Sequence, residues 1–176
     1  MRGIPGHLTR DGHVLVVEMR RSSKRNAADR ALADEINAAL TLFDEDDDLW
    51  AGVLAAAGSV FSAGSDLASG GDYFTERGGG YGIIRRNRTK PLIAAPDGPA
   101  LGGGFKIVLA CDLVVASDAA VFGLPEVARG PVPTCAGCSA RHAAAESRAR
   151  TDSHPRVRLR IARLRGRFRQ RPRPRW

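Results

Sequence analysis

The feature that most constrains this chain is a run of three glycines, Gly102, Gly103 and Gly104, between a short apolar stretch and a helix-like segment. Glycine has no Cβ, so a glycine-rich entry to a helix lets the backbone approach a ligand closely and leaves N–H groups free in the first turn. Such N–H groups, together with the positive end of the helix dipole, bind anions. The run therefore predicts either an anion-binding turn or a tight packing turn.

The segment from Val60 to Leu67 has a similar character. It reads VFSAGSDL, a strand-like stretch that ends in small residues and leads into a turn. Asp66 is suited to cap a short helix there. The backbone N–H of Ser65 could join that of Gly103 in holding the oxyanion that develops on a reacting carbonyl.

A carboxylate further along the chain extends this pattern. Glu126 follows Lys106 by twenty positions, and a carboxylate beside an oxyanion site can transfer protons. Lys106 itself is a cation at a position where the pattern favours a second carboxylate. The sequence thus points to chemistry on a carbonyl, with one of two expected acids replaced.

The motifs, in this order, resemble those of the crotonase superfamily, the enoyl-CoA hydratases and isomerases. The matching pieces are KRNA at 24–27, FSAGSDL at 61–67, GPALGGGFKIVLACDLVVAS at 98–117 and FGLPEVARG at 122–130. Several motifs in the right order are far more specific than one, and the match covers roughly residues 8 to 137. The resemblance implies an α/β fold wound as a spiral of β-β-α turns. It also implies a reaction on acyl-CoA thioesters, such as adding water to 2-enoyl-CoA in the β-oxidation of fatty acids.

Site residues follow from the same resemblance, position by position. The oxyanion-hole amides would be those of Ser65 and Gly103. The coenzyme A moiety would be bound by six residues in two segments, namely Lys24, Arg25, Ala27, Ala63, Asp66 and Leu67. Coenzyme A would enter as part of the substrate, so no separate cofactor or metal is expected.

Lys106 is where the chain departs from this family. In the hydratases two glutamates hold and activate the added water; one matches Glu126 and the other matches Lys106. An ammonium cannot accept a proton, so we expect a chain that binds acyl-CoA but hydrates poorly. Lys106 would either pair with Glu126 or extend to solvent. A truncated, inactive acyl-CoA binder or a non-functional product remains an alternative to an enzyme, and family members without the first glutamate include isomerases.

Local periodicity predicts most of the secondary structure. Asp11-Gly12 between residues 8–9 and 14–17 indicates a hairpin. Residues 28–43 are expected to form a helix, ended by a solvated acidic loop at 44–48. The apolar face of this helix contains Leu32, Ile36, Leu40 and Phe43. Strands are expected at 52–57, 92–95 and 113–116, and strands that alternate with helices indicate an α/β class.

The polar stretch around Gly78-Gly79-Gly80 is less specific. It is expected to be either a flexible loop over the acyl pocket or a plain linker. The next segment, expected to be helical, carries Arg85, Arg86 and Arg88. These arginines would form a solvated basic face or contact the phosphates of coenzyme A.

The chain changes character near Cys138. Residues 138–176 hold thirteen Arg and two acids, a balance of +11, and since the whole chain carries +8, residues 1–137 sum to −3. We therefore divide the chain into an acyl-CoA-binding core at 1–137 and an Arg-rich tail at 138–176. The tail has no period that would bury a face, which predicts disorder. It does not resemble the family's C-terminal helices, which support trimers and hexamers, so the usual assembly is doubtful here.

Three interpretations of the tail stay open. It could be an out-of-frame or degenerate C-terminus, because GC-rich coding DNA read in another frame gives an Arg, Ala, Pro and Gly bias. It could bind nucleic acid or an anionic surface through its charge. Phe168 and Trp176 are its only large aromatic residues, which makes sequence-specific binding of nucleic acid unexpected. It could also be an exposed tail without a partner.

The cysteines bear on location and on metal binding. Cys135 and Cys138 form a C-x-x-C without a second pair, so we expect no zinc site. Cys111 lies in an apolar segment and is expected in the core. The chain has no apolar run long enough to span a membrane and no signal-peptide pattern. A cytoplasmic protein with reduced thiols is expected.

Overall fold

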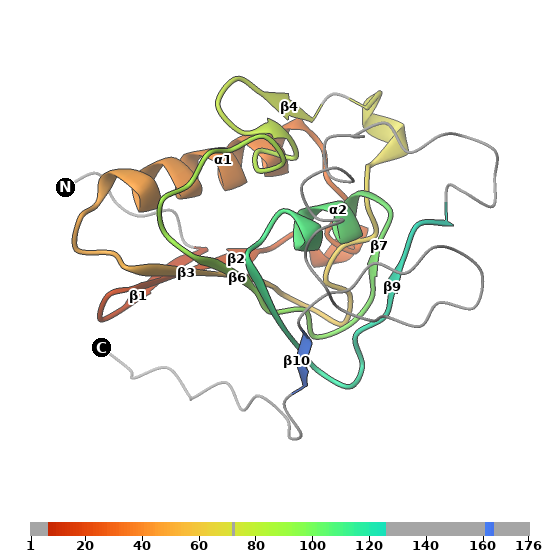
Figure 1. Ribbon diagram of the computed structural model, residues 1–176. Coiled ribbons are helices and arrows are strands. Elements are labelled where there is room, and N and C mark those ends of the chain that lie inside the picture. The colour runs from red at the N-terminus through yellow and green to blue at the C-terminus, as the bar shows by residue number, and fades with distance from the viewer. Residues whose placement is uncertain (1–6, 72, 126–160, 164–176) are drawn as a thin grey trace, which may run out of the picture.

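A six-stranded sheet forms the centre of the molecule (Figure 1). The computed structural model describes residues 7–71, 73–125 and 161–163. The strand order is β1-β2-β3-β6-β8-β10, with bounds Leu8–Asp11, Val14–Met19, Ala51–Ala56, Leu92–Ala94, Leu113–Ala116 and Ile161–Arg163. β1 is antiparallel to β2, and every other neighbouring pair in this sheet is parallel. Parallel neighbours need crossover connections, so the predicted α/β class is confirmed.

A second set of short strands runs beside the main sheet. β7 (Ala100–Leu101) pairs in parallel with β9 (Phe122–Gly123), and Ser62 forms a parallel bridge with Ala100. Along the chain, β6 leads to β7, then to helix α2 (Gly103–Leu109), and then to β8 and β9. The turn from β6 through β7 to α2 thus places one strand in the main sheet and one beside it, as expected for a β-β-α spiral.

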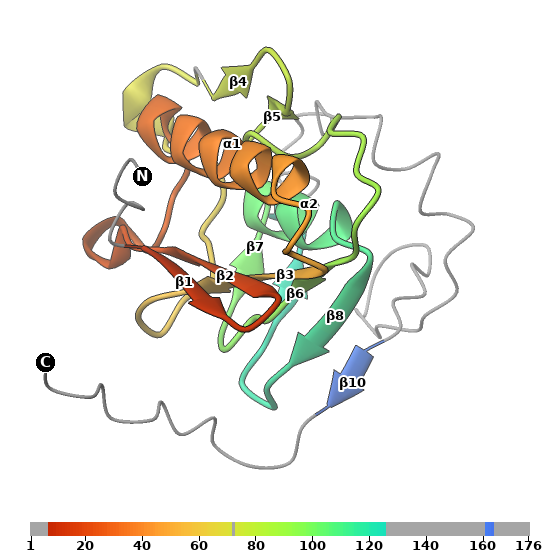
Figure 2. The same cartoon turned by 90° about the vertical axis from the view of Figure 1, so that its left-hand side faces the viewer.

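The long helix α1 (Arg30–Glu45) covers one face of the sheet, on the same side as α2 (Figures 1 and 2). Its buried residues are Leu32, Ala33, Ile36, Ala39, Leu40 and Phe43, which include all four that the periodicity placed on the apolar face. Close packing explains the glycine on β3 beneath it. A Cβ on Gly52 would lie 2.8 Å from Leu92 Cδ1 and 3.3 Å from the Phe43 ring.

Both ends of α1 differ from the prediction. The helix begins two residues late, because Asp29 caps it by accepting from the Leu32 N–H at 2.9 Å. Ala28 instead bridges to Ser65 outside the helix. The helix also continues through Glu45, and Asp44 is largely buried because Arg86 donates to it at 2.8 Å. The acidic run is therefore not simply a solvated loop.

The remaining strands agree with the sequence. Leu8 pairs with Val17 and Asp11 with Val14, which confirms the hairpin; its two loop residues are Gly12 and His13. The three predicted core strands correspond to β3, β6 and β8 with shifts of one residue at most. Cys111 lies in the core as expected, and burial raises the pKa of its thiol to about 12.

The glycines at 78–80 are neither linker nor open loop. β5 (Gly79–Gly80) pairs antiparallel with β4 (Phe74–Thr75), and all three glycines are buried. A Cβ on Gly78 would overlap the backbone of Gly82, so this is a tightly packed hairpin. Turns rather than the expected helix follow it.

Arg86 corrects the prediction of a solvated basic face. Its side chain is 0% exposed and donates to Asp44, Thr41 and Asn37. Arg88 is 8% exposed at its side chain and donates to the Ala110 carbonyl. These two arginines serve packing, while Arg85 is exposed.

Of the tail at 138–176, the structure describes Ile161–Arg163, which form the edge strand β10 beside β8. The predictions on Glu126, Cys135, Cys138, Phe168 and Trp176 lie outside the described residues. Within the described ranges, no helix is long and apolar enough to cross a membrane.

Candidate active site

The glycine run forms the turn that leads into α2. Gly102 adopts φ 54°, ψ −120°, a conformation that glycine alone reaches easily, and its N–H donates to the Gly123 carbonyl at 2.8 Å. A Cβ on Gly103 would overlap the Tyr81 hydroxyl, and a Cβ on Gly104 would overlap the Ser62 carbonyl. The turn is therefore both tightly packed and, at Gly103, the source of an N–H at the start of a helix.

The loop that carries Ser65 lies against this turn. Gly64 has φ +99°, and a Cβ on it would lie 3.0 Å from the Gly103 nitrogen. The backbone N–H groups around Ser65 are used: Ala63 donates to Arg25, Gly64 to the Ser62 hydroxyl, and Asp66 to Ala28. The structure thus brings the two predicted oxyanion-hole segments side by side.

Among the described residues, neither predicted donor amide is bonded to a backbone carbonyl. Within residues 7–71 and 73–125, the N–H groups of Ser65 and Gly103 donate to no backbone carbonyl. A free N–H is the rule in the first turn of a helix, where Gly103 lies, and is less common in a loop such as the one that carries Ser65. Stabilisation of a carbonyl oxyanion requires such a pair of free donors, and the assignment of Ser65 and Gly103 to this role stays a prediction.

The two segments predicted to hold coenzyme A also adjoin each other. Ala63 N–H donates to the Arg25 carbonyl at 3.0 Å, and the Ala28–Ser65 bridge follows. Lys24 is the last residue of the short helix η1 (Ser22–Lys24), and Arg25 follows it. Both side chains are exposed. Exposed cations on one side of this junction can bind phosphate groups.

Asn26 and the short helix η2 shape this junction. Asn26 is 0% exposed, and its amide donates to the carbonyls of Ala57 and Val60. η2 (Leu67–Ser69) is capped by Asp66, which accepts from the Ala68 N–H at 3.1 Å as the sequence suggested. Leu67 at its start is 87% exposed.

Arg21 is a residue of this region that sequence reasoning missed. Its guanidinium donates to the Ala27 carbonyl at 2.8 Å and pairs with Asp66 at 2.8 Å and Asp29 at 2.9 Å. The hydrogen bond from Arg21 is the main cause that lowers the pKa of the Asp66 carboxyl. No spacing in the sequence links Arg21 to Asp66, because the contact joins loops that only the fold brings together.

Tyr81 is the second functional candidate that the sequence did not assign. Its hydroxyl lies 2.9 Å from the Ser65 Oγ, and its side chain packs on the face of Gly103 where a Cβ would stand. The residue is 1% exposed. Tyr81 therefore contacts both segments that carry the candidate donor amides.

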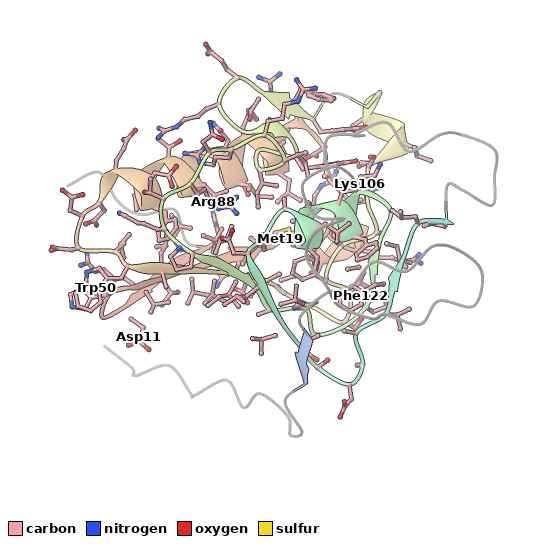
Figure 3. All side chains as sticks on the ribbon, in the orientation of Figure 1. Asp11, Met19, Trp50, Arg88, Lys106 and Phe122 are labelled. Atoms are coloured by element: carbon pink, nitrogen blue, oxygen red, sulfur yellow. The ribbon has the colours of Figure 1, made fainter. Side chains whose placement is uncertain are left out.

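Lys106 lies one turn into α2, among the buried side chains of that helix (Figure 3). It is 6% exposed, so the alternative that its side chain simply extends to solvent is wrong. Trp50 and Asp11 mark the opposite end of the molecule (Figure 3). The expected pairing with Glu126 stays a prediction, because Glu126 is not among the residues that the structure describes.

The sequence and the fold of this chain both match those of known proteins. The sequence model of the enoyl-CoA hydratase/isomerase family matches residues 9–150. A mevalonyl-coenzyme A hydratase from Aspergillus fumigatus is 42% identical over 67% of this chain and 46% of that protein. The crystal structure of an enoyl-CoA hydratase from Mycobacterium tuberculosis aligns with a TM-score of 0.69 at 35% identity, over 73% of this chain and 52% of that one.

A carnitinyl-CoA dehydratase from Mycobacterium avium aligns with a TM-score of 0.68 at 39% identity, over 73% of this chain and 51% of the other. The chain thus spans about half the length of the relatives that it matches. The family model matches well over half of the chain and the solved structures share its fold, so this chain belongs to the enoyl-CoA hydratase/isomerase family.

Proposed function

We propose that this chain binds acyl-CoA thioesters and stabilises the enolate-like form of the thioester, as an enoyl-CoA hydratase or isomerase does. One observation carries the proposal. The N–H groups of Ser65 and Gly103 lie on adjoining segments and donate to no backbone carbonyl within the described ranges. A thioester oxygen placed between them would receive two hydrogen bonds that strengthen as negative charge develops on it.

Coenzyme A would lie along the adjoining loops. Lys24 and Arg25 are exposed cations for its phosphates, and Ala27, Ala63, Asp66 and Leu67 would border its adenine end. Coenzyme A is recognised here as part of the substrate. The family's chemistry needs no metal or redox group, because the proton transfers and the oxyanion hole suffice.

Glu126 would move the proton. In a hydration it would deliver its proton to the carbon next to the thioester while the water oxygen bonds to the next carbon, and the proton that the water loses would pass to a base. Lys106 stands where a second carboxylate would activate that water, and an ammonium cannot accept the proton. We therefore propose that hydration is slow, by about 10²–10⁴-fold relative to a site with both carboxylates.

Isomerisation of the double bond is a second candidate, and the buried Lys106 favours it. Moving a double bond between positions 2 and 3 of an acyl chain needs one group that takes and returns a proton. Glu126 and the oxyanion hole would suffice for this reaction. We place the activity in the cytoplasm, in the metabolism of fatty acyl groups.

The test is a paired assay on purified full-length chain. One arm follows loss of 2-butenoyl-CoA to water addition, and the other follows conversion of 3-hexenoyl-CoA to the 2-isomer. Activity in either arm that Glu126→Gln abolishes, while binding persists, supports the proposal. The corresponding pantetheine thioesters, which lack the adenine nucleotide, serve as the control for coenzyme A recognition. A folded chain that binds neither thioester contradicts it.

A further inference from the structure

We propose that Tyr81 is a positioning residue that sets the spacing between the Ser65 and Gly103 amides by bonding to one segment and packing on the other. The inference rests on the proposed function and extends it to a residue outside the family motifs quoted above. Tyr81 touches no reacting atom in this account, since it is 1% exposed. It acts through Ser65.

Two contacts place Tyr81 between the donors. Its hydroxyl and the Ser65 Oγ share a hydrogen bond of 2.9 Å. On the other side, a Cβ on Gly103 would overlap the Tyr81 hydroxyl oxygen and lie 2.9 Å from its ring carbon Cε1. The absence of a Cβ at Gly103 therefore leaves the space that the Tyr81 phenol occupies. In this proposal, a shift of the phenol would change the distance between the two amides.

The backbone conformation of Tyr81 is energetically unfavourable, and the surrounding structure holds it in place. Tyr81 has φ 58°, in the left-handed region that bulky residues rarely adopt. Its N–H donates to the Tyr73 carbonyl at 2.8 Å. The flanking Gly82 packs so closely on α1 that a Cβ would overlap the Ala33 carbonyl. The strained residue is thus anchored to the longest helix of the described chain.

The ring has a rigid backing as well. Tyr73 and Tyr81, the two tyrosines of the chain, stack with centroids 4.5 Å apart and ring planes 4° apart. Tyr73 precedes β4 and Tyr81 follows β5, so the hairpin, helix α1 and the oxyanion segments form one connected support. Oxyanion stabilisation depends on donors held in place before the reaction, and such a support is what preorganises them.

The expected effect is on polarisation of the substrate more than on its binding. Coenzyme A would be held mainly by exposed residues of the loops at 24–27 and 63–67, whereas the buried phenol contacts the second loop at the Ser65 hydroxyl. We expect Tyr81→Phe to lower kcat about threefold to tenfold, the range that losing one hydrogen bond produces, with KM changed less than about twofold. Ser65→Ala removes the partner hydroxyl and should have the same effect. Because both act through one bond, the double variant should be no worse than either single one.

A spectroscopic readout keeps this test independent of turnover. Hydrogen bonding to a carbonyl lowers its stretching frequency, so the infrared band of bound butanoyl-CoA with an isotopically labelled carbonyl reports on the oxyanion hole directly. The full chain would be compared with Tyr81→Phe, Ser65→Ala and the double variant. Tyr73→Phe is the matched control, since it removes a phenolic hydroxyl from the same stacked pair. Circular dichroism and the unfolding midpoint would check that each variant is folded.

The outcomes separate the two proposals. A downshifted band in the full chain that moves back toward the free frequency in Tyr81→Phe and Ser65→Ala, with Kd unchanged and Tyr73→Phe unaltered, supports the positioning role. A downshift that stays unchanged in folded Tyr81→Phe overturns that role and leaves the proposed function standing. Binding without a downshift in the full chain, or no binding, overturns both.

Discussion

The guanidinium of Arg21 joins Asp66 at 2.8 Å, and the same side chain reaches Asp29 at 2.9 Å. Arg21 precedes η1, Asp66 caps η2, and Asp29 caps α1. One cation therefore ties together the starts of three elements that surround the proposed coenzyme A site. Arg21 would act on the substrate only by holding these segments.

This ion pair predicts a dependence of stability on pH. Arg21 holds the pKa of the Asp66 carboxyl below its ordinary value of 3.8. A carboxyl with a lowered pKa in the folded state stabilises the fold above its unfolded pKa, and this contribution is lost as the pH falls through the folded pKa. We expect Asp66→Asn to lower the free energy of unfolding at pH 7, and the difference from the unmodified chain to shrink as the pH drops below about 4.

Denaturant titrations at several pH values would measure this. Asp34→Asn is the control, because the Asp34–Arg30 pair is about half exposed on both sides and such pairs contribute little. A stability difference for Asp66→Asn that stays constant from pH 7 down to acid would contradict the role of the ion pair.

Arg86 should matter to stability far more than its neighbour Arg85. Removing the buried arginine leaves Thr41 without this partner and leaves Asp44 paired only with the more distant, part-exposed Arg77 at 3.6 Å, and breaking a buried ion pair in this way costs about 3–5 kcal/mol. Arg86→Ala should lower the free energy of unfolding by that amount. Arg85→Ala, at an exposed position, should change it by less than about 0.5 kcal/mol. Equal effects of the two substitutions would rule out a buried structural role for Arg86.

Gly104 tests the close packing of the turn before α2. A Cβ there would overlap the Ser62 carbonyl and lie 2.7 Å from the Ser62 Cβ, and overpacking of this kind costs about 1–3 kcal/mol. A Cβ on Gly123 would lie 3.5 Å from Leu101 Cδ2, an ordinary contact. Thermal unfolding should therefore separate Gly104→Ala from a nearly neutral Gly123→Ala. If Gly104→Ala unfolds at the unmodified midpoint, the packing is looser than described.

Lys106 offers a gain-of-function test. Lys106→Glu restores the second carboxylate, and we expect hydration of 2-butenoyl-CoA to rise by about 10²-fold or more, the contribution of one general base. Lys106→Met is the matched control, because it removes the charge and supplies no proton acceptor. Equal hydration rates for the two folded variants would show that the residue at this position does not activate water.

Much of the fold could be predicted because its signals are local. The apolar face of α1 follows from a period that Leu32, Ile36, Leu40 and Phe43 display in sequence, and the Asp66 cap follows from its neighbours. The end of α1 could not be predicted, because Asp44 continues the helix only where Arg86, far along the chain, pairs with it. Tertiary partners override local propensity in such cases.

The site shows the same division. Ser65 and Gly103 were identified through motifs, and the structure brings their segments together. Arg21 and Tyr81 were missed, since each acts through contacts between loops. The burial of Lys106 could not be predicted either, because lysines are almost always exposed and this one is 6% exposed.

The central claim is that the Ser65 and Gly103 amides bind a thioester oxygen, and amide NMR of the full chain tests it most directly. Butanoyl-CoA would be titrated into isotopically labelled protein, with coenzyme A as the control that lacks a carbonyl. The account predicts that the Ser65 and Gly103 N–H resonances move downfield with the thioester alone, while resonances of the loop at 24–27 move with both ligands. The claim would be contradicted if the thioester binds and those two N–H resonances stay where coenzyme A leaves them.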